Sequence, residues 1–154
     1  MDKKKLIDLY PYKVVDNEVS FLLFRRAKGK IYEEQWRMVG GKVMPQETYW
    51  QAALRELKEE TNLVPKIFWT IPSINQFYEY SSDKILNIPA FAAEINPDDT
   101  IQLDAEHTEF KWIQPEDAST HIQWPEQIRL IELTNRLITS NKILDDWRVP
   151  ITSS

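Results

Sequence analysis

Runs of apolar and β-branched residues predict that the chain begins with two paired strands. The segments 6–15 and 19–26 are rich in such side chains, and Asp16-Asn17 between them is a turn signal. A third apolar run, 36–39, leads into two consecutive glycines, and we expect the backbone to turn tightly there. Further strand-like segments follow at 66–80, 85–94 and 109–113.

Apolar side chains at helical spacing predict two long helices. The first spans about 48–61, with Glu47 near its positive end and Asn62 at its C-terminus, where a left-handed residue is common. At about 100° per residue its core face consists of Trp50, Leu54, Leu57 and Thr61.

The second long helix begins at Pro125, a favoured first helical position. Its apolar residues would cover the sheet: Ile131, Leu133, Leu137 and Ile138. Strands on both sides of a central helix, followed by a terminal helix, favour an α/β protein with a mixed sheet between helices.

The first helix carries three acids close together in the stretch RELKEET. By the same counting, Glu56, Glu59 and Glu60 lie within an arc of about 100°, where like charges repel. A solvated face usually mixes both signs of charge, whereas a divalent cation would turn this repulsion into binding. Oxygen ligands suit Mg²⁺ or Mn²⁺, which often bridge carboxylates and substrate phosphates.

Composition narrows the class of protein. A chain of 154 residues that is 42% hydrophobic suits one domain, and we expect residues 1–154 to form it. It contains no cysteine, which excludes disulfides and thiolate chemistry, and no apolar run long enough for a membrane helix. The net charge of −5 and the lack of a dense basic run disfavour polymeric nucleic acid as a partner. A cytoplasmic protein is expected.

The central stretch GGKVMPQETYWQAALRELKEETNL closely resembles the Nudix box. Gly41 and Glu47 are separated by five residues, and seven more precede the run RELKEETNL. Asn62 departs from the family pattern, which usually has glycine there. Asparagine also tolerates a positive φ angle, so the departure is compatible with the pattern.

This resemblance implies a Nudix α/β/α sandwich and hydrolysis of a nucleoside diphosphate linked to another group. In such proteins the acids matching Glu56, Glu59 and Glu60 hold Mg²⁺ or Mn²⁺, which polarises the diphosphate and activates water, and any of the three is a possible base. An acid from a late loop commonly joins them, and Glu106 is preferred here to Glu109 because it precedes a strand. The implied catalytic set is therefore Glu56, Glu59, Glu60 and Arg55. The implied metal ligands are the Gly40 carbonyl, Glu56, Glu59, Glu60 and Glu106, while Glu47, Arg55 and Gly41 brace the site.

The outer segments NIPAFAAEI, LDAEHTEFKWIQPEDA and IQWPEQIRLIELTNRL resemble the nucleoside-triphosphate pyrophosphohydrolase branch. That branch includes dATP and dihydroneopterin triphosphate pyrophosphatases, so the expected partner is a small nucleotide or pterin polyphosphate. Arg26 is a candidate phosphate contact. Aromatic rings that would stack on the base include Trp36, Tyr78 and Trp124, with Phe77 as a further candidate. We expect a monomer or a homodimer.

Other functions stay open at this point. Hydrolysis of ADP-ribose or a diadenosine polyphosphate is compatible with the box, which does not distinguish leaving groups. A non-catalytic Nudix module that senses a nucleotide is disfavoured because every box glutamate is present. An isopentenyl diphosphate isomerase is disfavoured because that enzyme relies on a cysteine.

Overall fold

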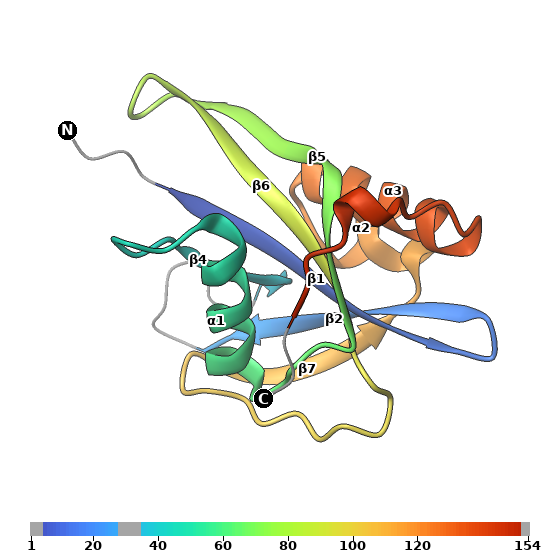
Figure 1. Cartoon of the computed structure of the whole chain (residues 1–154). Helices are drawn as coiled ribbons and strands as arrows, with labels where there is room; N and C mark the ends of the chain where they lie inside the picture. The colour runs from blue at the N-terminus through green and yellow to red at the C-terminus, as the bar shows by residue number, and fades with distance from the viewer. Residues whose placement is uncertain (1–4, 28–34, 152–154) are drawn as a thin grey trace.

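The computed structural model describes residues 5–27 and 35–151, which form a mixed sheet between helices (Figure 1). The strands are β1 Leu6–Val15, β2 Glu18–Arg26, β3 Trp36–Arg37, β4 Val39–Lys42, β5 Ile67–Glu79, β6 Lys84–Glu94 and β7 His107–Ile113. The helices are α1 Tyr49–Thr61, α2 Ala118–His121 and α3 Pro125–Thr139, with 3-10 turns at Pro115–Asp117 and Asp145–Trp147. The predicted elements are present at nearly the predicted bounds.

Strand β1 lies at the centre of the sheet, whose main order is β3-β2-β1-β6-β5. It pairs in parallel with β6 and antiparallel with β2 and β4, while β7 extends the sheet from β2. Asp16 and Asn17 both have positive φ angles in the turn between β1 and β2. The predicted α/β class with a mixed sheet is confirmed.

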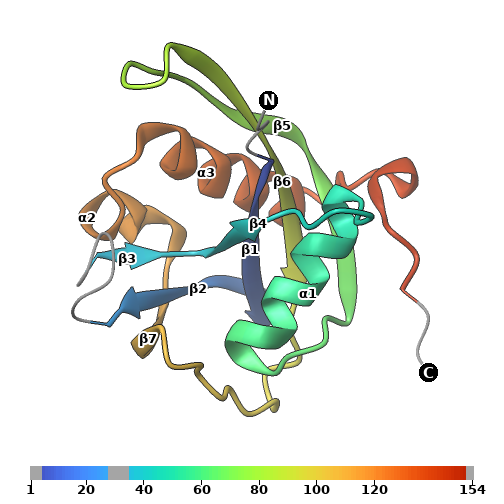
Figure 2. The same ribbon diagram turned by 90° about the vertical axis from the view of Figure 1, so that its left-hand side faces the viewer.

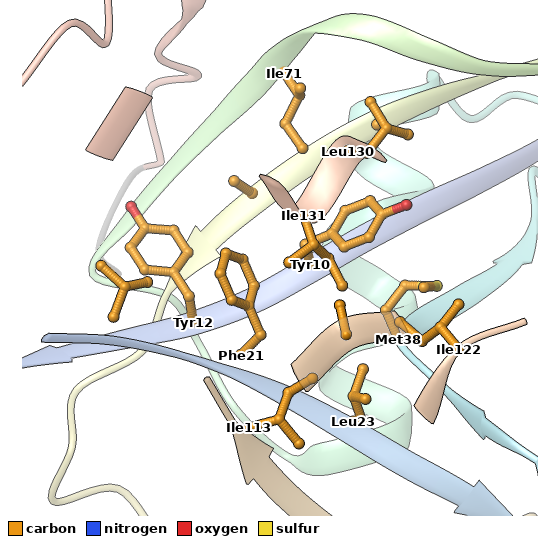
Figure 3. Close-up of a cluster of buried hydrophobic side chains, with 14 of the residues drawn as sticks. Tyr10, Tyr12, Phe21, Leu23, Met38, Ile71, Ile113, Ile122, Leu130 and Ile131 are labelled. Carbon is orange, nitrogen blue, oxygen red and sulfur yellow. The ribbon is translucent and has the colours of Figure 1, made fainter. Parts of the chain in front are cut away.

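Each face of the sheet has its own apolar core. Helix α1 covers one face, where Leu57 packs among residues of β1, β2 and β6. Helices α2 and α3 cover the other face (Figure 2), where Leu130 and Ile131 pack against a layer that includes Tyr10 and Phe21 (Figure 3). This arrangement is an α/β/α sandwich.

Helix α1 has defined signals at both ends. The Thr48 hydroxyl accepts from the Gln51 backbone N–H, and the Gln51 side chain accepts from the Thr48 N–H, which is a capping box. Asn62 ends the helix in the left-handed region at φ 63°, as predicted from its residue type.

The core face of α1 differs from the prediction. Trp50 is 37% exposed, whereas Ala52 and Ala53 are fully buried together with Leu57 and Thr61. Two alanines bring the helix backbone close to the sheet, and a large indole at the first turn remains at the rim. The prediction that Trp50 belongs to this core was wrong.

The predicted turn at Gly40-Gly41 was also wrong. Both glycines lie inside β4 and pair with β1, Gly40 opposite Asp8 and Gly41 opposite Ile7. Neither adopts a positive φ angle, so conformational freedom is not why glycine stands there.

Among the described helices, none is long and apolar enough to cross a membrane.

Candidate active site

A cleft of about 660 Å³ opens between the second half of α1, strand β4 with the loop that follows it, and the loop before β7. Two segments distant in sequence supply its acidic side chains. The lining residues are Arg26, Gly40, Gly41, Lys42, Val43, Met44, Pro45, Glu56, Glu59, Glu60, Asp104 and Glu106. The structure thus brings the box acids, both glycines, Arg26 and Glu106 together.

Gly41 is required by the closeness of Glu56. A Cβ at Gly41 would fall 2.3 Å from Glu56 Cδ, far inside any real carbon contact. At Gly40 the nearest atom to such a Cβ is the Ile7 carbonyl at 3.5 Å, an ordinary contact. The bare backbone at Gly41 is therefore the space into which the Glu56 carboxylate fits.

Arg55 joins the β4–α1 loop to the acids of the helix. Its Nε and Nη2 donate to the two oxygens of Glu47 at 2.6 and 3.0 Å, and Nη2 also donates to the Lys42 carbonyl at 2.9 Å. Its Nη1 reaches Glu56 at 2.5 Å and Glu59 at 3.2 Å. Hydrogen bonds from Arg55 and from the Met44 N–H hold the pKa of Glu47 below its usual range. This network supports a bracing role for the pair.

Glu60 is the buried member of the acidic trio. Its residue is only 4% exposed, and burial raises the pKa of its carboxyl well above the usual range. A hydrogen bond with Glu56 and the charge of Asp104 raise it further. These influences favour the protonated form of the carboxyl when no cation is present. A cation that bound Glu60 would favour the ionised form instead.

Glu106 and Glu109, the two candidate metal ligands from the late part of the chain, have different surroundings. Glu106 lines the cleft, whereas Glu109 pairs with Arg25 at 2.7 Å. Asp104, which sequence reasoning did not single out, also lines the cleft. The preference for Glu106 agrees with this geometry, although its role as a ligand stays a prediction.

One of the predicted substrate contacts lines the cleft, and the aromatic candidates do not. Arg26 lies in the cleft, and its buried Nε has no hydrogen-bond partner within the described residues. Trp36, Tyr78 and Trp124 do not line the cleft. Trp36 lies edge-on to His121, with their ring centroids 6.1 Å apart.

The other two aromatic candidates lie elsewhere. Tyr78 is 58% exposed on the β5–β6 hairpin, which extends past the rest of the sheet (Figures 1 and 2). Trp124 is 42% exposed at the start of α3, with its ring edge-on to Phe77 at 4.9 Å and its N–H donating to Asn75. An exposed indole held in this way offers a face for stacking, and the role of Trp124 as a substrate contact stays a prediction.

The donor set fits a hard divalent cation, although the side chains are not arranged as a finished cage. The cleft offers carboxylate oxygens and backbone carbonyls, the ligands that Mg²⁺ and Mn²⁺ prefer. In residues 5–27 and 35–151, no three His, Asp or Glu side chains already form a metal-ready group. Arg55 holds Glu56 and Glu59, and Glu60 is turned toward His107. Ion binding would have to draw these oxygens away from their present partners.

The comparisons with known proteins decide the family. The model of the NUDIX domain matches residues 12–134, which include the whole cleft-forming region from α1 to β7. The chain belongs to the NUDIX family. As a Nudix hydrolase it is an enzyme that acts on phosphoric anhydride bonds.

Two curated Nudix relatives cover most of the chain. The asymmetrical bis(5'-nucleosyl)-tetraphosphatase of Caenorhabditis elegans is 32% identical over 74% of this chain and 81% of its own. The CTP pyrophosphohydrolase of Escherichia coli K12 is 29% identical over 77% of this chain and 84% of its own. The predicted resemblance to pyrophosphohydrolases of this family is confirmed.

A solved Nudix structure has the same fold. The binary complex of the C. elegans Ap4A hydrolase superposes with a TM-score of 0.74 at 26% identity, covering 90% of this chain and 99% of that one. The α/β/α sandwich is therefore the fold of this family.

Proposed function

We propose that this Nudix hydrolase depends on Mg²⁺ or Mn²⁺ and cleaves a nucleoside or pterin triphosphate to a monophosphate and pyrophosphate. The observation that carries the proposal is the cleft itself, which gathers five acidic residues beside one arginine. Such a cleft repels a polyphosphate unless a cation accompanies it. Dependence on a divalent ion follows from this charge balance.

The residues that would hold the ion are Glu56, Glu59, Glu60, Glu106 and the carbonyl of Gly40. When bound, it would neutralise phosphate charge and polarise the anhydride for attack by water. One carboxylate of the trio would accept the proton of the attacking water, while Arg55 keeps Glu56 and Glu59 in place.

Arg26 and Trp124 are the proposed substrate contacts. Arg26 lines the cleft and its Nε has no hydrogen-bond partner within the described residues, so its guanidinium is a candidate partner for a phosphate oxygen. The indole of Trp124 offers a fixed, partly exposed surface for stacking on a base or pterin. Trp36 and Tyr78 are less well placed for this role.

A dinucleoside tetraphosphate is the second candidate substrate. One observation favours it, namely the 32% identity to a relative named as an asymmetrical tetraphosphatase. The two candidates differ in the group attached beyond the cleaved anhydride, and the acidic cleft would serve either.

Product analysis on a substrate panel tests the proposal. Purified protein with Mg²⁺ is offered CTP, dATP, dihydroneopterin triphosphate, diadenosine tetraphosphate and ADP-ribose. We expect monophosphate and pyrophosphate from a triphosphate, and a loss of about two orders of magnitude or more in Glu59→Gln and Glu60→Gln. Full activity in both variants contradicts the site. Tight nucleotide binding without turnover supports a sensing module instead.

A further inference from the structure

Glu60, Asp104 and His107 form a closed ring of contacts between α1 and the loop before β7. The Asp104 backbone N–H donates to the Glu60 carbonyl at 3.3 Å. The Asp104 carboxylate lies 2.8 Å from His107 Nδ1, and His107 Nε2 lies 3.7 Å from Glu60 Oε1. Backbone and side chains therefore connect the same two segments, which run close together in Figure 1.

His107 is fixed within this ring. Its side chain is 4% exposed and packs against Phe24, with ring centroids 5.5 Å apart. Because a carboxylate oxygen only accepts hydrogen bonds, the contact with Asp104 places a ring proton on Nδ1. The other ring nitrogen is thereby turned toward Glu60, and the imidazole has no room to swing into solvent.

Asp104 also contacts the backbone of the residue that carries a second cleft carboxylate, Glu106. The same Oδ1 that contacts His107 accepts from the Glu106 backbone N–H at 3.3 Å. The Glu106 carbonyl in turn accepts from the Ala27 N–H at 2.8 Å, next to Arg26. One carboxylate oxygen thus fixes both the imidazole behind Glu60 and the backbone that carries Glu106.

We propose that Asp104 and His107 are a positioning pair that sets the relative placement of Glu60 and Glu106 in the cleft. The inference rests on the proposed function, because it assigns these two acids to the metal-dependent site. A buried histidine with one satisfied nitrogen is often only a core residue. His107 differs from that case in two ways. Its Nε2 lies against one cleft acid, Glu60, and it directly follows another, Glu106.

Three substitutions at position 107 test the pair. In His107→Gln the amide reaches toward the place of Nε2, in His107→Asn it reaches toward that of Nδ1, and His107→Phe keeps a buried ring without polar atoms. The measurements are the Mn²⁺ dissociation constant by calorimetry without substrate, kcat and KM for the best substrate of the panel, and the thermal unfolding midpoint. His121→Gln, a change at the half-buried histidine that contacts Lys111, is the matched control.

We expect His107→Asn and His107→Phe to weaken Mn²⁺ binding and lower kcat by about 10- to 100-fold, the usual effect of removing a ligand's supporting partner. KM for the nucleotide should change by less than about threefold, because neither variant touches the substrate. His107→Gln should keep most of the wild-type Mn²⁺ affinity and kcat, and His121→Gln should match the wild type in both.

Two results overturn the positioning pair. One is equal loss in all three variants, in parallel with a lower unfolding midpoint, which marks His107 as a core residue only. The other is wild-type Mn²⁺ affinity and kcat throughout. If Mn²⁺ binding weakens as expected while the wild type turns over no substrate, the proposed function fails and the positioning pair stands.

Discussion

Arg55 binds both carboxylate oxygens of Glu47 across the β4–α1 loop, at 2.6 and 3.0 Å. The same guanidinium reaches Glu56 and Glu59, so one group connects the end of the loop with the acidic face of the helix. Only a planar group with several fixed donors can make these contacts at once.

Arg55→Lys should therefore lower kcat/KM by about 10- to 100-fold, because an ammonium cannot replace the bidentate contact and still reach Glu56. Steady-state kinetics with Mg²⁺ measure this. Arg129→Lys is the matched control, since Arg129 makes a similar pair with Glu126 on α3. Equal losses in the two variants would mean that general destabilisation is responsible.

Gly41→Ala should lower kcat strongly while changing the free energy of unfolding only a little. The added methyl conflicts with the flexible end of the Glu56 side chain, which can move aside. We expect a loss of less than about 1 kcal/mol in the free energy of unfolding but at least about a tenfold loss in kcat, since the displaced carboxylate no longer faces the cleft. Urea unfolding and kinetics on the same preparation check both. In Gly40→Ala the new methyl meets only ordinary contacts, so a larger kcat loss there than at Gly41 would contradict the argument.

Glu60→Gln should make the metal-free protein less sensitive to pH. Because the folded-state pKa of Glu60 is raised above its usual value near 4.5, its contribution to stability is greatest in acid. That contribution falls as pH rises toward the folded-state pKa. Thermal unfolding in EDTA should show the wild type losing stability from pH 5 to pH 9, and Glu60→Gln losing less.

Two comparisons complete that experiment. Glu59→Gln, at a side chain that is 55% exposed, should leave the wild-type slope unchanged. Saturating Mn²⁺ should restore the wild type at pH 8 but not Glu60→Gln. A wild-type profile that is level in EDTA would contradict a raised pKa at the buried Glu60.

Asp8 makes a separate contribution on the opposite face of the sheet. Its buried Oδ2 accepts from Asn75 on β5 at 3.0 Å and from Gln127 on α3 at 3.2 Å. Burial raises the pKa of this carboxyl, so its stabilising effect also decreases as pH rises. Asp8→Leu removes the acceptor of the buried Asn75 amide and of the half-buried Gln127 amide, and should cost about 2–5 kcal/mol in urea unfolding. Asp8→Asn keeps an acceptor and should cost clearly less; an equal loss would exclude the hydrogen bonds as the cause.

Signals that act within a few residues were predictable from the sequence. The turn at Asp16-Asn17, the start of α3 at Pro125 and the left-handed Asn62 each follow from the conformational preferences of one or two residues. The spacing of the box acids placed them on one face of α1, and the structure brings them to one cleft.

Features that depend on a distant partner were not predictable. The pair Gly40-Gly41 suggested a turn because glycine is most often used for its backbone freedom, yet the real constraint is the Glu56 side chain fifteen residues later. Trp50 has the correct helical spacing for the core, but its side chain is 37% exposed at the first turn of α1. The pairing of His107 with both Asp104 and Glu60 required knowing where the loop lies; the only hint was a histidine directly after Glu106.

The parallel pairing of β1 with β6 imposes an order of events during synthesis. Asp8 lies opposite Ala90, so a ribosome must release more than half of the chain before β1 can acquire this neighbour. The loop that carries Asp104 and Glu106 emerges later still. In a nascent chain, α1 would therefore be present for a time without the loop that completes the cleft. Hydrolytic activity is expected only after the sequence through β7 has left the exit tunnel.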